Sequence, residues 1–196
     1  MRPHGLTLLL LAPLLAACQD VYHPLKGGVG FMEIPTGTDT FQISYLGDSG
    51  SAVPEARRFA MLRASELAVL RDMPYFQITQ EQIFLSYGSR YWPGSDTRYV
   101  ETYPDRRGHV RAYIYHAYDP GYTEFYMVPD VEMQVRLTTD AAAPSIPAAY
   151  LLRQAQADKI KLSAGVAERL PSLPDASGPV TLPPEPKATT KPGIVP

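Results

Sequence analysis

Stretches in which apolar and polar residues alternate most constrain the fold of this chain. Residues 40–45 alternate Phe, Ile and Tyr with Thr, Gln and Ser, and residues 110–116 and 131–137 repeat the alternation. A period of two is typical of a β-strand that buries one face and exposes the other to solvent. The sequence Gly-Asp-Ser-Gly at 47–50 supplies a turn after the first stretch. These segments therefore predict strands of a half-buried sheet.

The next segment predicts a helix. Pro54 suits the first helical position and Pro74 ends the segment. Its small and apolar residues recur at three- and four-residue intervals, as one face of a helix requires: Ala56, Phe59, Ala60, Ala64, Leu67 and Leu70. Arg63 falls within this stripe, where an unpartnered charge would be costly, and Glu66 follows three residues later. We expect Arg63 and Glu66 to form a structural ion pair, with the arginine methylenes lying on the sheet.

The remaining segments complete a mixed fold. Residues 75–78 and 83–87 predict one or two strand pieces, and residues 88–108 predict a long hairpin or loop. A second helix is expected from about Pro147 through Ile160. The predicted fold class is α+β: an antiparallel sheet with one main helix packed on it, a C-terminal helix and a disordered Pro-rich tail.

The two ends of the chain differ from its centre. Eight of the twenty prolines lie in residues 171–196, where bulky apolar residues are too few to offset the entropy of ordering. Near the other end, residues 27–30 read Gly-Gly-Val-Gly and no apolar period is present, which predicts a tether. The expected organisation is a signal peptide (1–17), a tether (18–30), an α+β domain (31–140), a C-terminal helical segment (141–170) and a disordered tail (171–196).

The N-terminus has the layout of an export signal. Arg2 precedes an apolar run at 6–15, which is too short to span a bilayer comfortably and which leads into Leu-Ala-Ala-Cys at 15–18. This end resembles the lipobox of bacterial lipoproteins. The resemblance implies a diacylglyceryl group on Cys18, cleavage before Cys18 and acylation of the new amine. Two or three acyl chains anchor a protein stably, because each buried methylene contributes about 0.8 kcal/mol.

The same resemblance implies a compartment. Cys18 is the single cysteine of the chain, so no internal disulfide can form. In enteric bacteria an Asp directly after the lipidated Cys favours retention in the inner membrane, whereas Gln19 holds that place here. We expect a cell-envelope protein that is lipid-anchored at the periplasmic face of the outer membrane.

A wider resemblance covers roughly residues 18–140. Val29-Gly30-Phe31, the helical segment Leu62-Arg63-Ala64-Ser65-Glu66-Leu67-Ala68 and the closing strand to Leu137 resemble a family of small uncharacterised proteobacterial lipoproteins. That family has a glycine-aromatic start, a strand, a helix with an Arg-Ala-Ala-Glu-Leu-like motif and further strands. This chain departs from the pattern at Ser65 and in its long Pro-rich end. The resemblance implies a fold and a compartment but no activity.

No reaction centre is predicted. The formal net charge of −2 offers no broad basic field, which argues against nucleic acid as a partner. His109 and His116 bracket a strand and would point to opposite faces, which makes them a poor metal pair, and His23 falls in the tether. We therefore expect no enzyme activity, no cofactor and no metal. The competing hypothesis is a hydrolase that uses His116 with Asp119 or Glu124, which requires these groups to converge in a cleft.

Aromatic residues gather in the second half of the α+β segment. Nine of the thirteen tyrosines, together with Trp92 and several arginines, lie between positions 87 and 126. Aromatic faces stack on sugar rings and arginines pair with carboxylates, so this segment is a candidate ligand surface for peptidoglycan or lipid-bound glycans. The candidate residues are Tyr87, Tyr91, Trp92, Arg111, Tyr113 and Tyr115. The alternative is that these tyrosines only stabilise strands through cross-strand pairs.

These features favour a non-enzymatic scaffold or interaction module of the cell envelope. Its expected partners are membrane lipid, through acylated Cys18, and an envelope protein or peptidoglycan. The first alternative is a periplasmic binding module for a glycan or small ligand, which requires a concave pocket lined by several tyrosines. The second is the hydrolase described above.

Overall fold

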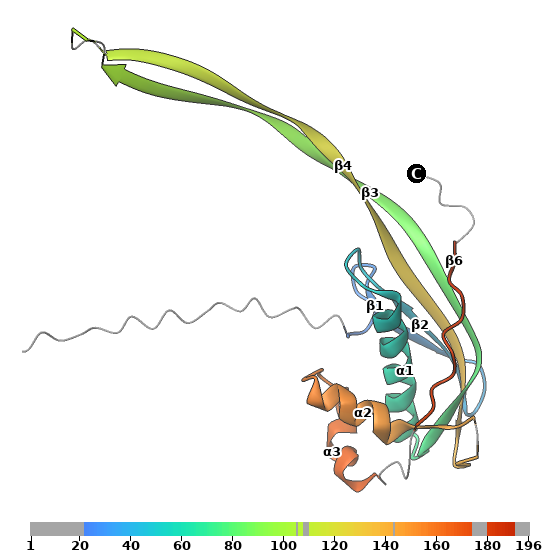
Figure 1. The fold of residues 1–196 in the computed structure, drawn as a ribbon. Helices are drawn as coiled ribbons and strands as arrows, with labels where there is room; N and C mark the ends of the chain where they lie inside the picture. The colour runs from blue at the N-terminus through green and yellow to red at the C-terminus, as the bar shows by residue number, and fades with distance from the viewer. Residues whose placement is uncertain (1–21, 105, 108–109, 143, 174–179, 191–196) are drawn as a thin grey trace, which may run out of the picture.

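The fold is a sheet with helices packed on one face and one very long hairpin (Figure 1). The computed structural model describes residues 22–104, 106–107, 110–142, 144–173 and 180–190. The elements in chain order are β1 (Gly30–Pro35), β2 (Thr40–Leu46), α1 (Val53–Leu70), β3 (Tyr75–Pro104), β4 (Val110–Thr138), β5 (Ile146–Pro147), α2 (Ala148–Ala157), α3 (Val166–Arg169), a 3-10 helix (Leu170–Ser172) and β6 (Thr189–Thr190).

The sheet has six strands and mixed direction. Its order is β1-β2-β4-β3-β5, with every neighbouring pair antiparallel, and β6 pairs with β3 in parallel. The prediction of an α+β fold with a main helix on a sheet agrees with this architecture. The prediction of a purely antiparallel sheet is wrong, because the C-terminal segment returns alongside β3 in the same direction as β3.

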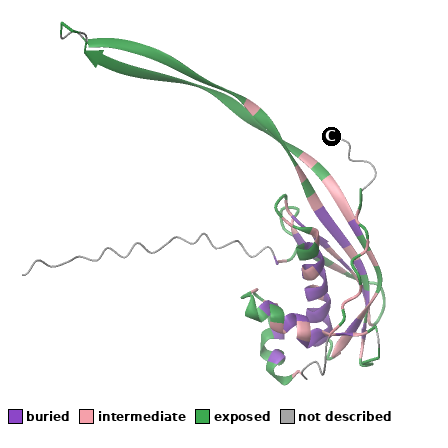
Figure 2. Ribbon diagram, viewed as in Figure 1, coloured by how far each residue is buried: buried purple, intermediate pink, exposed green. Residues whose placement is uncertain are grey.

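The core lies between α1 and one face of the central strands. On β2, Phe41, Ile43 and Tyr45 are buried while the residues between them are half-exposed. The predicted stripe of α1 faces them, and its alanines at 56, 60 and 64 are fully buried, which lets the helix approach the sheet closely. α2 closes the core beside α1 with Leu151, Leu152 and Ala155. Burial is confined to this body of the molecule (Figure 2).

The strand predictions after α1 are too short. Residues 75–78 and 83–87 belong to one strand, β3, which continues to Pro104, so most of the stretch predicted as a hairpin or loop at 88–108 is strand. The stretches at 110–116 and 131–137 likewise belong to one strand, β4. β3 and β4 pair from Tyr75↔Thr138 to Pro104↔Val110, with one irregularity between Ile78 and Gln80. The outer part of this hairpin projects far from the body (Figure 1).

Residues before β1 pack on the core, although the sequence predicts a tether as far as Gly30. Tyr22 is 5% exposed, and its ring centroid lies 4.9 Å from that of Phe31 and 5.6 Å from that of Phe59. The Leu25 amide donates a 2.7 Å hydrogen bond to the Phe31 carbonyl. Burial of an aromatic ring outweighs the glycine-rich composition here. Cys18 and the predicted signal peptide lie outside the described residues.

The C-terminal part also contacts the core. α2 occupies Ala148–Ala157 within the helix predicted at 147–160. The prediction of disorder does not hold for residues 180–190, where Val180, Leu182 and Ala188 are half-buried against the core. Arg57 of α1 holds this segment by donating a 2.9 Å hydrogen bond from Nη2 to the Pro183 carbonyl. Proline lacks a donor but keeps its carbonyl acceptor, and a buried arginine can use it. Among the described helices, none has the length and apolarity needed to cross a bilayer.

Candidate interaction surface

The outer part of the β3–β4 hairpin is the most unusual surface of the protein. β6 pairs with β3 as far as Leu85, and β2 pairs with β4 as far as Asp130. Beyond these points, among the described residues, β3 and β4 pair only with each other. We call this part, residues 86–104 and 110–128, the arm. At about 3.3 Å per residue it extends for about 60 Å.

The arm exposes an unusual amount of apolar surface. None of its described residues is buried (Figure 2). Its large exposed apolar side chains are Tyr87, Tyr91, Trp92, Tyr99, Val100, Tyr103, Val110, Tyr113, Ile114, Tyr115, Tyr118, Tyr122, Phe125 and Met127. Monomeric proteins rarely expose large apolar areas to water, and a two-stranded hairpin without a third strand or a helix is marginally stable. Contact with a partner would therefore stabilise the arm.

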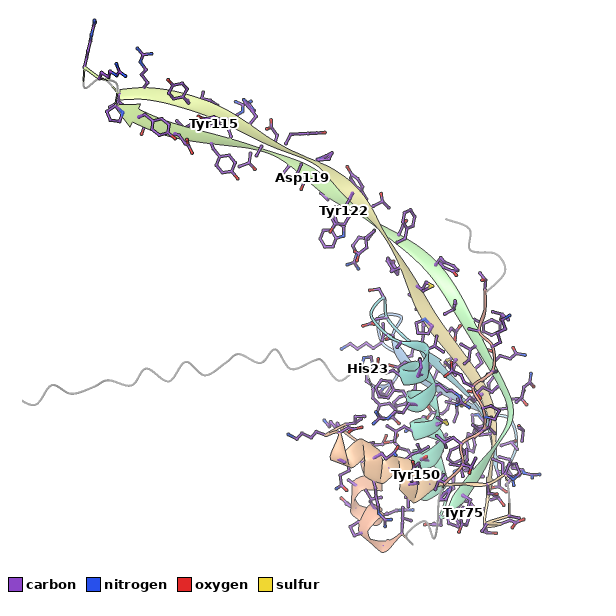
Figure 3. The ribbon with its side chains drawn as sticks, viewed as in Figure 1. His23, Tyr75, Tyr115, Asp119, Tyr122 and Tyr150 are labelled. Atoms are coloured by element: carbon purple, nitrogen blue, oxygen red, sulfur yellow. The ribbon has the colours of Figure 1, made fainter. Side chains whose placement is uncertain are left out.

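Two glycines allow the strands to approach at the middle of the arm. Pro93 faces Gly121 across the hairpin. A Cβ at Gly94 would lie 2.0 Å from the Asp119 carbonyl oxygen, and a Cβ at Gly121 would lie 2.5 Å from that of Trp92. Gly121 also has a φ of +73°, which disfavours other residues. This midpoint, near the labelled Asp119 and Tyr122 in Figure 3, separates a proximal half (86–92 and 122–128) from a distal half (95–104 and 110–119).

The proximal half carries a ring platform. Trp92 and Tyr122 stack with centroids 6.4 Å apart and an interplanar angle of 26°. The Trp92 Nε1 donates a 3.0 Å hydrogen bond to Glu124 Oε2, and the Arg90 guanidinium lies 5.6 Å from the Trp92 ring. These contacts fix the indole in place while leaving it 42% exposed. The platform combines a flat apolar face with charges of both signs.

The distal half exposes apolar side chains on both sides of the pleat. Tyr99 faces Tyr115 on one side, and Val100 faces Ile114 on the other. Val100 and Ile114 are 61% and 63% exposed. Since neither side is covered within the described structure, the distal half offers two faces and two strand edges to a partner.

The six predicted ligand residues all lie on the arm, but they do not form one patch. By strand alternation, Tyr87 and Tyr91 share one side of the proximal half and Trp92 lies on the other. Arg111, Tyr113 and Tyr115 share a side of the distal half, beyond the midpoint. Tyr99, Tyr118, Tyr122 and Phe125 are not among the six candidates, although they are 54–76% exposed, against 42–64% for the five predicted aromatic residues. Only the paired strands reveal that the whole arm is exposed.

The groups of the hydrolase hypothesis do not converge. His116 Nδ1 lies 3.3 Å from Asp96 Oδ1 rather than beside Asp119. Asp119 Oδ1 accepts a hydrogen bond from the Gly121 amide, and Glu124 accepts from Trp92. His23 contacts the Pro24 carbonyl on the body, and His109 lies outside the described residues. Over the residues that the structure describes, no three His, Cys, Asp or Glu side chains are grouped to hold a metal.

A charged network anchors the body beneath the arm. Arg63 Nη1 lies 2.7 Å from Glu66 Oε2, and Arg63 Nη2 lies 2.6 Å from Glu33 Oε1 of β1. The Arg63 guanidinium also lies 4.6 Å from the centroid of the Phe31 ring. Glu66 is fully buried and accepts hydrogen bonds from the Tyr22 hydroxyl and from the amide and hydroxyl of Ser163. Glu33 and Ser163 carry no sequence signal for this role.

The network shifts two pKa values. Burial, reinforced by the Glu66 carboxylate, raises the pKa of the Tyr22 hydroxyl well above its ordinary value. Burial alone would lower the pKa of Arg63, but hydrogen bonds to Glu33 and Glu66 raise it. Tyr22 therefore stays protonated and Arg63 stays charged. This pattern fits a structural network that joins α1, β1 and the residues before β1.

A shallow concavity lies beside β1, β2 and β4. It measures about 210 Å³ and is lined by Leu25, Gly30, Met32, Ser44, Leu46, Asp130 and Glu132. No arm tyrosine lines it, so it is not the pocket that the binding-module hypothesis requires. No family model, curated protein or solved structure matches this chain.

Proposed function

We propose that this chain is a non-enzymatic interaction module of the bacterial cell envelope, held at the periplasmic face of the outer membrane by acylated Cys18. The arm is the part that contacts its partner. The observation that carries this proposal is a paired, aromatic-rich hairpin of about 60 Å with no buried residue. The lipobox-like N-terminus supports the anchor, because acyl chains on Cys18 would hold the body at a membrane.

The side-chain chemistry of the arm favours a protein partner. Protein interfaces are enriched in Tyr, Trp and Arg and depleted in Lys. The arm holds nine tyrosines, Trp92 and several arginines, whereas every lysine of the chain lies outside it. The arm therefore has the composition of a binding interface.

The attachment of the arm also supports a scaffold role. β3 and β4 continue without a break from the arm into the core, where Ile83, Val131 and Met133 are buried. Arg57 and Glu81 form a nearly buried bidentate ion pair between α1 and β3, with distances of 2.6 and 2.9 Å. The arm is thus an extension of the core sheet, so a partner bound to it is held at a defined position relative to the body.

The anchor is tested directly on the mature protein. Mass spectrometry of its first peptide should find acylated Cys18 as the new N-terminus, and the protein should fractionate with membranes. A Cys18→Ala variant should lose both properties. A freely soluble protein that keeps its first eighteen residues and carries no fatty acid would overturn the anchor and the compartment.

The arm is tested by removal and by crosslinking. Replacing Gly88–Tyr126 with Asn-Gly joins Tyr87 to Met127, which already face each other, through a favoured two-residue turn. A photocrosslinking residue at exposed Tyr91 should give adducts with envelope proteins in cells, whereas one at exposed Glu55 of α1 should not. Equal labelling from both positions, or unchanged complexes in the shortened protein, would contradict an arm-mediated role.

A glycan partner is the second candidate, favoured by the Trp92–Tyr122 stack beside Arg90. Such a platform suits a sugar ring flanked by a carboxylate. Full-length protein should then sediment with purified peptidoglycan. Trp92→Ala should weaken sedimentation by up to about tenfold more than Tyr118→Ala, since an aromatic stacking contact is worth roughly 0.5–1.5 kcal/mol. No retention above a control protein would exclude this candidate.

A further inference from the structure

We infer that the partner of the arm is a second copy of this chain, with the outer edge of β4 in one copy pairing with the outer edge of β3 in the next. This inference rests on the proposed function in one respect: a shared membrane makes the arms of neighbouring copies point the same way.

The two edges match in position and length. Among the described residues, β6 leaves the β3 edge open from Ser86 onward. On the other strand, the Gly47 amide still donates to the Pro129 carbonyl, so the β4 edge is open from Val128 onward. Leu85 and Pro129 are cross-strand partners, as are Ser86 and Val128. Both open edges therefore begin at the same cross-strand pair, and both run to Pro104↔Val110. An edge of one arm has the same extent as the opposite edge of the next.

Of the features that block edge pairing in other proteins, the edges of the arm carry only a few prolines. Exposed edge strands are ordinarily protected by lysines, bulges, prolines or short length. The arm has no lysine, and its register runs without a shift from Gln80↔Gln134 to Pro104↔Val110. Proline occurs only at positions 93, 104 and 120 within the arm. Each edge thus presents backbone donors and acceptors over most of its length.

The direction of the strands determines which edges of two neighbouring arms pair. If the arms point the same way, contacts between two β3 edges or two β4 edges would be parallel, whereas β4 against β3 is antiparallel. Antiparallel pairing is slightly more stable per residue and continues the pattern already present within each arm. The contact is heterologous, because it joins different surfaces of the two copies. Each added copy leaves one edge open, so the assembly grows until it closes on itself.

The side chains favour the register in which the two arms are not shifted along each other, which we call equal height. In that alignment each cross-strand neighbour within an arm is repeated between arms. Arg90 of one copy lies beside Glu124 of the next, Tyr99 beside Tyr115 and Val100 beside Ile114. Opposite charges, aromatic pairs and β-branched pairs are the combinations that stabilise antiparallel neighbours. The same matches that hold one arm together thus favour contact between arms.

The test is disulfide crosslinking between two differently tagged full-length copies in native membranes. One copy carries Thr97→Cys on β3, and the other carries Ala117→Cys, Tyr115→Cys or Asp119→Cys, which cover the equal-height register and a two-residue stagger either way. We expect a mixed dimer with one of these three partners. Ala112→Cys on the same strand lies on the other side of the pleat and serves as the matched control. Copies without an added cysteine control for Cys18.

Each outcome decides the inference. A mixed dimer above the Ala112→Cys control, with little dimer from either variant expressed alone, supports β4-to-β3 pairing. Disulfide dimers in membranes that contain only the Ala117→Cys variant would overturn β4-to-β3 pairing in favour of a symmetric contact between two β4 edges. No mixed dimer with any partner, in variants whose melting temperature equals that of the native chain, would overturn self-pairing. In that case, adducts from Tyr91 to another protein would leave the proposed function standing.

Discussion

The hydroxyl of Tyr22 donates a 2.7 Å hydrogen bond to the fully buried carboxylate of Glu66. The same carboxylate accepts hydrogen bonds from Arg63 and from Ser163, which lies between α2 and α3. One side chain of α1 therefore joins the residues before β1 to the C-terminal helices. This connection holds three separate parts of the body together.

Arg63→Ala should lower the melting temperature. The substitution leaves buried Glu66 without its ion-pair partner, and breaking a buried pair costs about 3–5 kcal/mol. For a chain of this size the loss corresponds to roughly 6–20 °C, at about 2–4 °C per kcal/mol. Arg58→Ala is the matched control, because Arg58 pairs with Asp158 at the surface, where a pair is worth about 0–1 kcal/mol. Thermal melting curves that coincide for the native chain and Arg63→Ala would contradict the structural role.

Tyr22→Phe should change stability in a pH-dependent way. Its folded pKa is raised by burial and by Glu66. The contribution of the Tyr22 hydroxyl to the free energy of unfolding is therefore fully present below its pKa of about 10 in the unfolded chain. It is lost as the pH rises through the higher pKa of the folded state. In urea unfolding, the native chain should be more stable than Tyr22→Phe at pH 8, and the difference should shrink above pH 10. Tyr118→Phe, at an exposed position, should show no such difference. A gap that stays constant with pH would argue against the raised pKa.

Arg57→Ala should release the C-terminal segment. Arg57 donates to the Pro183 carbonyl and to Glu81, so its removal deletes the charged contact of residues 180–190 with the core. A hydrogen bond to a charged group is worth about 1.5–3 kcal/mol, which predicts at least a tenfold faster cleavage after Lys187 by a lysine-specific protease. Arg58→Ala on the same helix should leave the rate unchanged. Equal rates for the two variants would show that Arg57 does not hold the segment.

Gly94→Ala should disrupt the distal half of the arm without unfolding the core. The new Cβ would lie 2.0 Å from a backbone carbonyl oxygen, which no rotamer change can relieve. Gly88→Ala is the control in the same strand, because its Cβ would meet the movable ring of Tyr126. Hydrogen exchange of residues 95–104 and 110–119 should accelerate only in Gly94→Ala, while the melting temperature of the body stays within about 2 °C. Unchanged exchange in the distal half would contradict the close approach at the midpoint.

The sequence predicts the body better than the arm because burial leaves a periodic pattern. Phe41, Ile43 and Tyr45 alternate with polar residues since one side of β2 faces α1, and Ala60 and Ala64 mark the side of α1 that faces the sheet. In the arm, residues 110–116 alternate and form a strand as predicted, but Val110 and Ile114 are exposed rather than buried, and on β3 the consecutive Tyr99 and Val100 are both exposed. The pattern of the arm therefore does not report burial. Residues 88–108 accordingly resemble a loop in sequence although most of them form a strand.

The contacts of the chain ends escape prediction for a different reason. Tyr22 sits in a glycine-rich segment, and its partner Glu66 is 44 residues away. Pro183 contributes a backbone carbonyl to Arg57 across 126 residues. Backbone acceptors are present in every residue and therefore leave no trace in composition. Composition correctly marks these ends as poor in apolar residues, but it does not reveal single anchoring contacts.

Hydrogen exchange on the arm itself tests most directly whether it is an interaction element. In dilute purified protein the outward-facing amides of residues 86–104 and 110–128 should exchange rapidly, because no second strand covers the two edges. In native membranes the same amides should become protected, since a partner occupies the edges there. Rapid exchange in both settings, with the core amides protected throughout, would contradict the assignment of the arm as the contact surface.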